Sequence, residues 1–252
     1  MGCGIVFRMN YSTQTDLATS RDGVWSMFDR IAPRYDCINR LLSFRKDVVW
    51  RRRVARLLPR EREIEVLDLA TGTADQLFAL VDRGLIIRRG VGIDLSERML
   101  EVGRRKIEAR GLGDRLELRS GDAMALPFPD QSFDAVTMSF GIRNVVDVLE
   151  TLKEIRRVLR PGGRALILEF SIPPSVSIRR FYFCYLRWTL PLLGRVISGD
   201  PYAYRYLNLT IEDFPHGAAF SELMLNAGFA RASVHQQTLG IAAIYEGNCP
   251  TR

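Results

Sequence analysis

Short apolar runs alternate with amphipathic stretches through the middle of the chain. Continuous apolar runs separated by helical patterns are typical of parallel strands in a sheet that is covered on both faces. The predicted strands are 66–69, 90–94, 115–119, 133–139 and 164–170. The predicted helices between them are 74–83, 96–110 and 146–159, with Ser96 as an N-cap and Pro161-Gly162-Gly163 as a stop signal. This pattern predicts an α/β fold with a Rossmann-like, doubly wound sheet.

The chain on both sides of this region carries different patterns. Apolar residues recur at helical spacing over 24–42, with a break at Pro33, and a basic helix is predicted over 50–58. Residues 172–215 mix aromatic residues, arginines and prolines, and we expect them to form a helical insert. Two runs, 230–238 and 241–246, flank a turn and predict an antiparallel hairpin that completes a seven-stranded sheet.

These patterns divide the chain into four segments. They are a basic N-terminal helical segment that forms part of a cover (1–60), a Rossmann-like core that carries the ligand site (61–171), an insert over that site (172–215), and the last helix with the closing strands (216–252). A length of 252 residues with 47% hydrophobic and 26% charged residues fits one α/β domain with extensions. This composition excludes disordered, collagen-like and disulfide-scaffold chains.

Charge and cysteine content narrow the partners and the compartment. The net charge is +7, and residues 1–60 hold 12 basic against 5 acidic side chains. A basic segment suits an anionic partner such as nucleic acid or the cytoplasmic leaflet, and a solvated helix face is the alternative. Four cysteines without a CxxC pair and only two histidines, His216 and His235, give no pattern for a metal site. We read the cysteines as reduced thiols of a cytoplasmic protein.

The sequence carries no pattern for a membrane span or a secretory signal. The best candidate span, 181–197, is interrupted by Arg187, Pro191 and Arg195. The first ten residues lack a basic segment followed by a sustained apolar run.

Residues 66–75, VLDLATGTAD, form the segment that is most informative about a ligand. They predict a strand, a turn of small residues and the start of a helix, and ligands of open α/β sheets bind beyond the carboxyl ends of the strands. The turn holds a single glycine, Gly72, whereas a dinucleotide fingerprint needs three. Asp75 at the helix start would repel a phosphate. The segment therefore favours a nucleoside over a dinucleotide.

Four carboxylates follow successive strands or their turns: Asp68, Asp75, Asp94 and Asp122. An acidic residue at the position of Asp94 commonly binds ribose hydroxyls, and Asp122 is placed to meet an adenine edge. No lysine is expected near this set. It therefore predicts a pocket for a cationic adenosine compound, and S-adenosylmethionine, with a sulfonium and an ammonium, is the obvious candidate. For each aspartate alone, capping or turn chemistry is the alternative.

The chain resembles class I S-adenosylmethionine-dependent methyltransferases, and more narrowly the menaquinone and ubiquinone C-methyltransferase family. The resemblance rests on FDRIAPRYDCIN at 28–39, VLDLATGTAD, GIDLSERML, GDAMALPFPDQSFDAVTMSFGIRNV, VLRPGGRALILEF and YRYL at 204–207, of which FGIRN at 140–144 is the most specific. It implies that S-adenosylmethionine binds at Thr73, Asp94, Asp122, Ala123 and Ser139. It also implies methyl transfer to a ring carbon of a polyprenylated hydroquinone.

The chain departs from the family pattern at two places. Ala74 stands where the family usually has a glycine, so we expect a less permissive backbone there. After Phe44 the family usually continues with a glycine and a histidine, whereas this chain has Arg45-Lys46-Asp47. We therefore expect the substrate entrance to differ.

The candidate catalytic residues are Arg143, Asn144 and Tyr35. Arg143 is the candidate for stabilising an oxyanion on the ring, and an ion pair that steadies the loop is the alternative. Asn144 is the candidate for orienting the ring or a water. Tyr35 and Tyr204 are candidates for hydrogen bonds to the headgroup, and His216 for a base.

The insert suggests how a prenyl tail is accommodated. Its aromatic residues, together with the N-terminal helices, are candidates for an apolar channel, and core packing is the alternative. The arginines that interleave them suit peripheral contact with an anionic membrane. A homo-oligomer stays open.

The acceptor has several alternatives. Thr71 favours demethylmenaquinol, and the methoxy-polyprenyl benzoquinol of the ubiquinone route or a small phenol stays open. A nucleic-acid methylase is disfavoured because SFGI at 139–142 stands where an Asn/Asp-Pro-Pro-aromatic motif is common. A module that binds S-adenosylmethionine without turnover is a further alternative.

Overall fold

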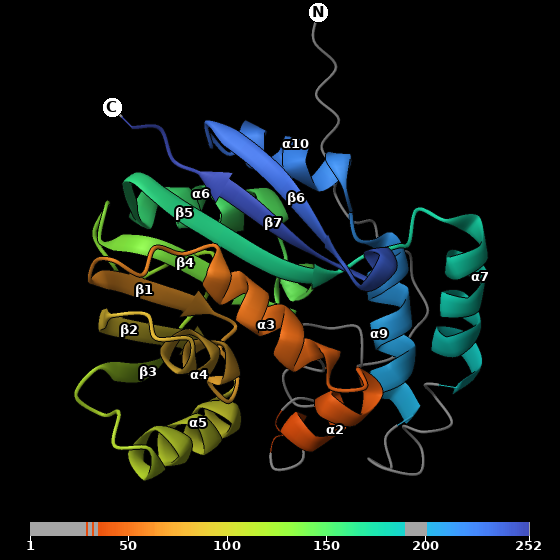
Figure 1. The fold of residues 1–252 in the computed structure, drawn as a ribbon, viewed down its shortest axis with the longest axis horizontal. Coiled ribbons are helices and arrows are strands. Elements are labelled where there is room, and N and C mark those ends of the chain that lie inside the picture. The colour runs from red at the N-terminus through yellow and green to blue at the C-terminus, as the bar shows by residue number, and fades with distance from the viewer. Residues whose placement is uncertain (1–28, 30–31, 33–34, 190–200, 252) are drawn as a thin grey trace, which may run out of the picture.

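The computed structural model describes residues 29, 32, 35–189 and 201–251. Its elements follow the order predicted from the hydrophobic pattern (Figure 1). They are α2 (Tyr35–Leu42), α3 (Lys46–Arg56), β1 (Ile64–Leu69), α4 (Asp75–Asp82), β2 (Ile87–Asp94), α5 (Glu97–Ala109), β3 (Leu116–Ser120), β4 (Phe133–Ser139), η2 (Ile142–Asn144), α6 (Val148–Val158), β5 (Leu159–Phe170), α7 (Val176–Cys184), η3 (Tyr185–Thr189), α9 (Pro201–Asp213), α10 (Ala218–Asn226), β6 (Arg231–Gln237), η4 (Thr238–Gly240) and β7 (Ala242–Asn248).

The seven strands form one sheet in the order β3-β2-β1-β4-β5-β7-β6. Strands β1 to β5 pair in parallel, and β7 pairs antiparallel with both β5 and β6. The predicted doubly wound sheet with an antiparallel C-terminal hairpin is therefore confirmed. The strand order reverses between β1 and β4, which is the place where ligands of such sheets bind.

One predicted boundary was wrong in detail. The helix α6 ends at Val158, before the predicted stop signal at 161–163, but β5 begins at Leu159 and not at the predicted residue 164. The pairing of β4 with β5 shifts register between Phe133 and Ala135, opposite this segment. The strand therefore includes the two glycines as an irregularity rather than beginning after them.

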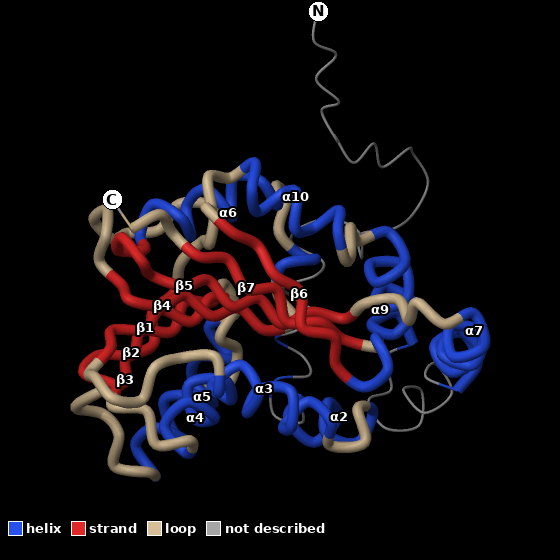
Figure 2. Tube along the Cα trace, turned by 45° about the horizontal axis from the view of Figure 1, so that its top comes forward, coloured by secondary structure: helices blue, strands red, loops and turns tan. Residues whose placement is uncertain are grey.

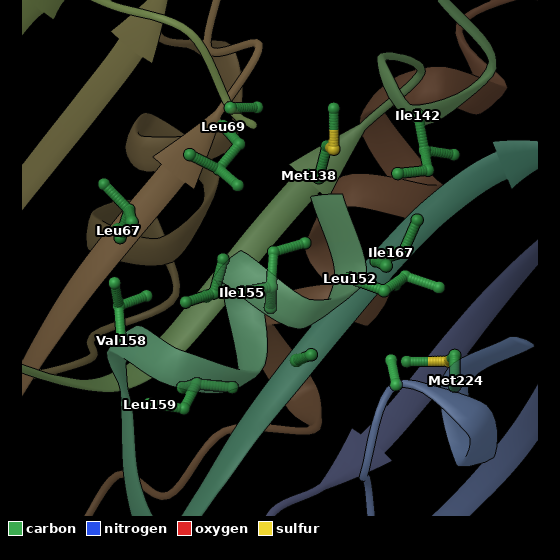
Figure 3. Close-up of a cluster of buried hydrophobic side chains, with 14 of the residues drawn as sticks. Leu67, Leu69, Met138, Ile142, Leu152, Ile155, Val158, Leu159, Ile167 and Met224 are labelled. Atoms are coloured by element: carbon green, nitrogen blue, oxygen red, sulfur yellow. The ribbon is translucent and has the colours of Figure 1, made fainter. Parts of the chain in front are cut away.

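The sheet is covered by helices on both faces, as its buried strands require (Figure 2). Helices α6 and α10 cover one face, and α3, α4 and α5 cover the other. On the α6 side, Ile155 and Met224 belong to a cluster with strand residues such as Leu67 and Ile167 (Figure 3). Alternation along the strands supplies both cores, since Val66 joins the opposite cluster.

The N-terminal helices and the insert gather beyond the carboxyl ends of the parallel strands. Figure 1 shows α2, α9 and α7 on the side toward which these strands point. Trp50 of α3 donates its indole N–H to Thr238 Oγ1 at 2.8 Å, and Tyr185 donates its hydroxyl to the backbone oxygen of Leu42 at 2.8 Å. The helical insert is thus confirmed over its described part. The predicted helical pattern at 24–34 lies outside the described residues, except for Asp29 and Ala32.

Candidate functional site

The turn between β1 and α4 has an unusual backbone. Ala70, Gly72 and Ala74 have positive φ angles of 48°, 54° and 67°. This left-handed region favours glycine. Ala74, where the family usually has a glycine, therefore stands at a position that a glycine would occupy with less strain. The Gly72 N–H donates to Asp94 Oδ2 at 2.7 Å. The turn is therefore held against the end of β2.

A cavity lies beyond the ends of the strands at the switch point. Asp94, Asp122 and Asn144 give it polar groups. Its apolar lining includes Ala70, Ile93, Leu95, Ala123, Met138 and Val145. The neighbouring Gly141 comes so close to Ala70 that a Cβ on it would lie 2.4 Å from the Ala70 Cβ. The cavity combines carboxylate acceptors with an apolar wall, which is the chemistry that a nucleoside needs.

Asp94 is buried but not saturated with hydrogen bonds. Its Oδ1 accepts from the Ser96 N–H at 2.9 Å, while Oδ2 accepts from Gly72. Burial raises the pKa of Asp94, which these backbone donors partly offset. The Leu95 N–H also donates to this carboxylate, but a carboxylate has about four lone-pair sites, so Asp94, which lines the cavity, keeps acceptor capacity. Asp122 Oδ1 accepts from the Met124 N–H at 3.0 Å and lines the same cavity.

Asp68 lies inside the sheet, where its side chain is 1% exposed. It accepts hydrogen bonds from the hydroxyls of Thr71 and Thr137, both at 2.6 Å. Burial raises the pKa of Asp68 to about 6. Its geometry assigns it to the support of the turn through Thr71. Its predicted contact with a cofactor stays a prediction.

Asp75 is part of a charged cluster that the sequence analysis missed. The expectation that no lysine lies near the four carboxylates was wrong, because α5 packs beside α4 and Lys106 Nζ lies 2.6 Å from Asp75 Oδ1. Lys106 also donates to Asp36 Oδ2 of α2 at 2.8 Å, and Arg40 donates to Asp75 Oδ2 at 3.1 Å. Thr73 Oγ1 donates to Asp36 Oδ1 at 2.6 Å. The cluster ties α2 to the turn and to α4 and α5.

Ser139 contacts α4, and Tyr35 of α2 contacts the turn between β1 and α4. Ser139 ends β4 and donates its hydroxyl to Gln76 Oε1 at 2.9 Å. Tyr35 packs over Gly72, since a Cβ on that glycine would lie 4.0 Å from Tyr35 Cε1. Burial raises the pKa of Tyr35, and a hydrogen bond with Asn39 partly offsets this. Their predicted roles stay predictions.

Arg143 and Asn144, which are neighbours on η2, belong to different surroundings. Asn144 lines the cavity with Asp94, whereas Arg143 Nη1 donates to Glu169 Oε1 at 2.6 Å and to the backbone oxygen of Phe140 at 2.9 Å. The side chains of Arg143 and Glu169 are 7% and 0% exposed. The ion pair that the alternative interpretation of Arg143 expects is thus present. Arg143 Nε is buried without a hydrogen-bond partner.

Tyr182 was named in the sequence only through the aromatic character of the insert. Its hydroxyl is buried without a hydrogen-bond partner, and both Arg143 and Glu169 act on its pKa, which burial raises. The Arg143 guanidinium lies 5.5 Å from the centre of the Phe170 ring, and Phe170 packs against the cluster that contains Tyr182. Tyr182 and Leu186 are four positions apart and share the buried face of the helix. This helical spacing is the sequence signal that could have identified Tyr182 as a buried residue.

Arg51 of α3 was missed as well. Its side chain is 8% exposed, its Nε has no hydrogen-bond partner, and its guanidinium lies 5.3 Å from the centre of the Phe140 ring. It also acts to lower the pKa of Asp68 and Asp75. The sequence offers no signal for this role, because Arg51 begins a run of three arginines.

The remaining candidates lie elsewhere or outside the described side chains. His216 Nδ1 lies 3.2 Å from the backbone oxygen of Phe214, in the segment between α9 and α10. The side chain of Tyr204 is outside the described part of α9. Within the described ranges no group of histidine, cysteine and acidic side chains has the geometry of a metal site. No helix there is long and apolar enough to span a membrane.

Comparisons with known proteins agree with this geometry. Residues 14–248 match the model of the ubiE/COQ5 methyltransferase family. A demethylmenaquinone methyltransferase of Thermus thermophilus is 46% identical over 89% of this chain and 100% of its own length. A ubiquinone/menaquinone biosynthesis C-methyltransferase, UbiE, of Geobacter sulfurreducens is 42% identical over 93% of this chain and 91% of its own.

Solved structures share the fold at low sequence identity. An S-adenosylmethionine-dependent methyltransferase of Thermotoga maritima matches with a TM-score of 0.61 at 20% identity, over 89% of this chain and 99% of that one. The cyclase SpnF matches with a TM-score of 0.59 at 16% identity, over 92% and 97%. These likenesses show the fold, while the sequence matches show the lineage. The chain therefore belongs to the ubiE/COQ5 methyltransferase family and is a methyltransferase.

Proposed function

We propose that this protein transfers a methyl group from S-adenosylmethionine to a ring carbon of a polyprenylated hydroquinone, with demethylmenaquinol as the acceptor. The observation that carries the proposal is the full-length match to a demethylmenaquinone methyltransferase at 46% identity. The site supports it with a cavity that Asn144 of η2 lines and with two buried donors without partners, Arg143 Nε and the Tyr182 hydroxyl.

The described residues fit S-adenosylmethionine. Asp94 keeps acceptor capacity for ribose hydroxyls, and Asp122 with the apolar wall suits an adenine ring. When bound, the cofactor supplies an electrophilic methyl group on a sulfonium. Gly72 and Thr73, on the turn beside Asp94, would hold its amino-acid end.

The ring of the acceptor attacks better when its hydroxyl is deprotonated, and Arg143 is suited to stabilise the resulting negative charge. Its guanidinium stays charged and, although Nη1 is bonded to Glu169, its Nε donor has no partner. Tyr182 offers a second donor, its hydroxyl, near the same guanidinium. Two buried donors without acceptors are costly unless a ligand or water completes them, so they support a headgroup site here.

Much of the acceleration in such a displacement comes from holding the two reactants in line and dry. The insert supplies this cover, since Tyr182 and Leu186 pack with Ile38 of α2 and Ile211 of α9. Asn144 lines the cavity next to Arg143 in the chain and is the candidate for orienting the ring or a bound water. The family names also include the benzoquinol route, which the following experiment separates from the naphthoquinol route.

The test is turnover of labelled S-adenosylmethionine with reduced demethylmenaquinone and the reduced benzoquinone precursor in parallel detergent micelles. We expect methylation of the naphthoquinol. In Arg143→Ala we expect a loss of kcat of at least about a hundredfold with cofactor affinity unchanged. Arg105→Ala, an exposed arginine of α5, is the matched control and should keep full activity.

Two results would contradict parts of this assignment. Methylation of the benzoquinol alone would overturn the choice of acceptor. Tight cofactor binding without turnover of either quinol would overturn the substrate class and leave the nucleoside site intact.

A further inference from the structure

The helix α7 and the following η3 have an unusual outer face. Their exposed positions recur at helical spacing and are Val176, Ser177, Arg180, Phe181, Cys184, Arg187 and Trp188. We define these seven residues as the α7 face. Val176, Phe181 and Trp188 are 70%, 78% and 76% exposed. Large apolar side chains therefore point to solvent from this element, with arginines set among them.

The inner face of the same element is apolar as well. Tyr182 and Leu186 are buried in a cluster with Ile38 and Ile211. A helix that is apolar on both faces is normally buried all round, in a protein core or in lipid. Here one face is packed on α2 and α9, and the outer face is left without a protein neighbour among the described residues.

The α7 face lies at the outer end of the molecule. Both Figure 1 and Figure 2 place α7 at one extreme, beyond α9 and away from the sheet. The apolar surface continues onto the turn between α2 and α3, because the Phe44 and Tyr185 ring centres are 6.1 Å apart and Phe44 is 72% exposed. Exposed apolar surface of this extent is uncommon on a protein that stays free in water.

Charge indicates which partner covers this surface. Residues 171–189 contain three arginines and no acidic residue, and Arg45 and Lys46 are exposed beside Phe44. Arg187 is paired with Glu212 at 2.9 Å, which leaves Arg180 as the exposed cation of the α7 face. Arginines set among aromatic side chains match an anionic lipid surface, where the rings enter the interface and the cations meet headgroups.

We propose that the α7 face, extended by Phe44, docks this protein on the anionic surface of a lipid bilayer. Docking there buries Phe181 and Trp188 in the interfacial region and sets Arg180, Arg45 and Lys46 among the headgroups. The buried side of α7, which carries Tyr182, then lies directly behind the lipid contact. A quinol with a lipid tail can pass from the bilayer to the headgroup site without crossing water. This route rests on the proposed function, whereas the docking itself does not.

The test is co-sedimentation of the full chain with vesicles of phosphatidylcholine and phosphatidylglycerol in equal parts, and with pure phosphatidylcholine vesicles. We expect binding to the mixed vesicles that weakens as salt rises. The double variant Phe181→Ser, Trp188→Ser should weaken this binding by about tenfold or more. The matched control Ile86→Ser, Leu225→Ser removes two exposed apolar side chains from other elements and should leave binding unchanged.

Two further arms separate the contributions. Arg180→Gln should weaken binding to the mixed vesicles but not to phosphatidylcholine, while Arg105→Gln on α5 should have no effect. Mixed vesicles should shift the tryptophan emission to shorter wavelength. In Trp188→Phe this shift should shrink while sedimentation with vesicles persists.

The outcomes that overturn the proposal are distinct. Equal vesicle binding by the double variant and its control excludes the α7 face as the lipid contact. A dimer in lipid-free solution that becomes a monomer in the double variant, without any change in vesicle binding, assigns the face to a second copy of the chain. Activity toward a soluble short-tailed quinol should stay unchanged in the double variant. Absence of that activity in the wild-type chain would count against the proposed function and leave the docking proposal standing. Loss of it only in a folded double variant would assign the α7 face to the reaction and overturn its role as a lipid contact alone.

Discussion

At the residue scale, the site is defined by polar groups whose surroundings are incomplete or unfavourable. Asp68 is buried with two threonine hydroxyls as its donors, while Arg143 and Tyr182 each keep a buried donor without an acceptor among the described residues. Such groups do not stabilise the folded chain by themselves. We interpret Asp68 as support for a strained turn, and Arg143 and Tyr182 as contacts for a ligand. Two predictions follow from this interpretation.

The first prediction concerns the pH dependence of stability at Asp68. The pKa of Asp68 in the folded state is about 6, above the ordinary value of 3.8. As the pH rises, the folded chain therefore keeps the proton on Asp68 to a higher pH than the unfolded chain does. The stabilisation is full below pH 3.8 and is lost as the pH rises through about 6. Relative to Asp68→Asn, the wild-type free energy of unfolding should fall by about 2 kcal/mol between about pH 4.5 and about pH 7.5.

Urea denaturation of both proteins at the two pH values measures this difference. Asp94 and Glu169, whose pKa values burial also raises, are present in both proteins and cancel in the comparison. A difference that stays constant between the two pH values would show that Asp68 is already charged in the folded chain throughout this range.

The second prediction separates Tyr182 from Tyr185. Tyr182→Phe removes a hydroxyl without a partner, so the free energy of unfolding should change by less than about 0.5 kcal/mol, while KM for the quinol should rise about fivefold to tenfold. Tyr185→Phe is the matched control because its hydroxyl donates to Leu42, and it should lose about 1 kcal/mol of stability with KM unchanged. Steady-state kinetics and denaturation of both variants decide this, and similar KM values for the two would remove Tyr182 from the headgroup site.

At the element scale, the chain's departures from its family's pattern fall where the backbone is left-handed. Ala74 has φ 67°, and Arg45, at the start of α3, has φ 60°. The Arg45 N–H closes the end of α2 by donating to the backbone oxygen of Arg40 at 2.7 Å. The turn therefore keeps its hydrogen bond without the glycine and carries strain in its place.

Arg45→Gly should raise the free energy of unfolding by about 0.5–1 kcal/mol, because relief of the left-handed strain exceeds the added entropy of the unfolded chain. Arg45→Ala keeps a Cβ at the same φ and should show no gain. Thermal or urea denaturation measures both. Equal shifts in the two variants would mean that the arginine side chain, and not the backbone, sets the stability of this turn.

The attachment of α2 depends on one lysine. Lys106→Gln leaves Asp36 and Asp75 without their shared cation, so the amide protons of α2 should exchange about tenfold faster while those of α6 are unchanged. Lys153→Gln, which breaks an exposed pair with Glu150, should change neither helix. Hydrogen exchange followed by mass spectrometry reads out the two helices separately. Uniform exchange rates in all variants would show that apolar contacts alone hold α2.

At the scale of the whole molecule, the cavity and the helical cover lie at the same end of one sheet. The strand ends near the switch point carry the nucleoside cavity, and the N-terminal helices with the insert close over the same end (Figure 1). The short helix η2 joins the two, since Asn144 faces the cavity and Arg143 pairs with Glu169 of β5. The cover also carries the α7 face, so the proposed lipid contact and the proposed headgroup site lie on opposite sides of one helix.

Much of this could be predicted from the sequence because local patterns determine it. Apolar runs and amphipathic periods fix the strands, the helices and their order, and Ser96 caps α5 as its position predicts, accepting from the Met99 N–H at 3.2 Å. The VLDLATGTAD and FGIRN segments are local in sequence and identify the family by themselves. Asp94 and Asp122 reach one cavity because parallel strands end at one edge.

The tertiary structure alone decided the contacts between residues that are far apart in the chain. Lys106 meets Asp75 across 31 positions, and Arg143 meets Glu169 across 26, so no local pattern announces either pair. The bonds of Asp68 to Thr71 and Thr137 and the burial of Tyr182 likewise depend on which face each element buries. Sequence periodicity states that a face is apolar, but the partner of that face is set by the packing of the whole chain.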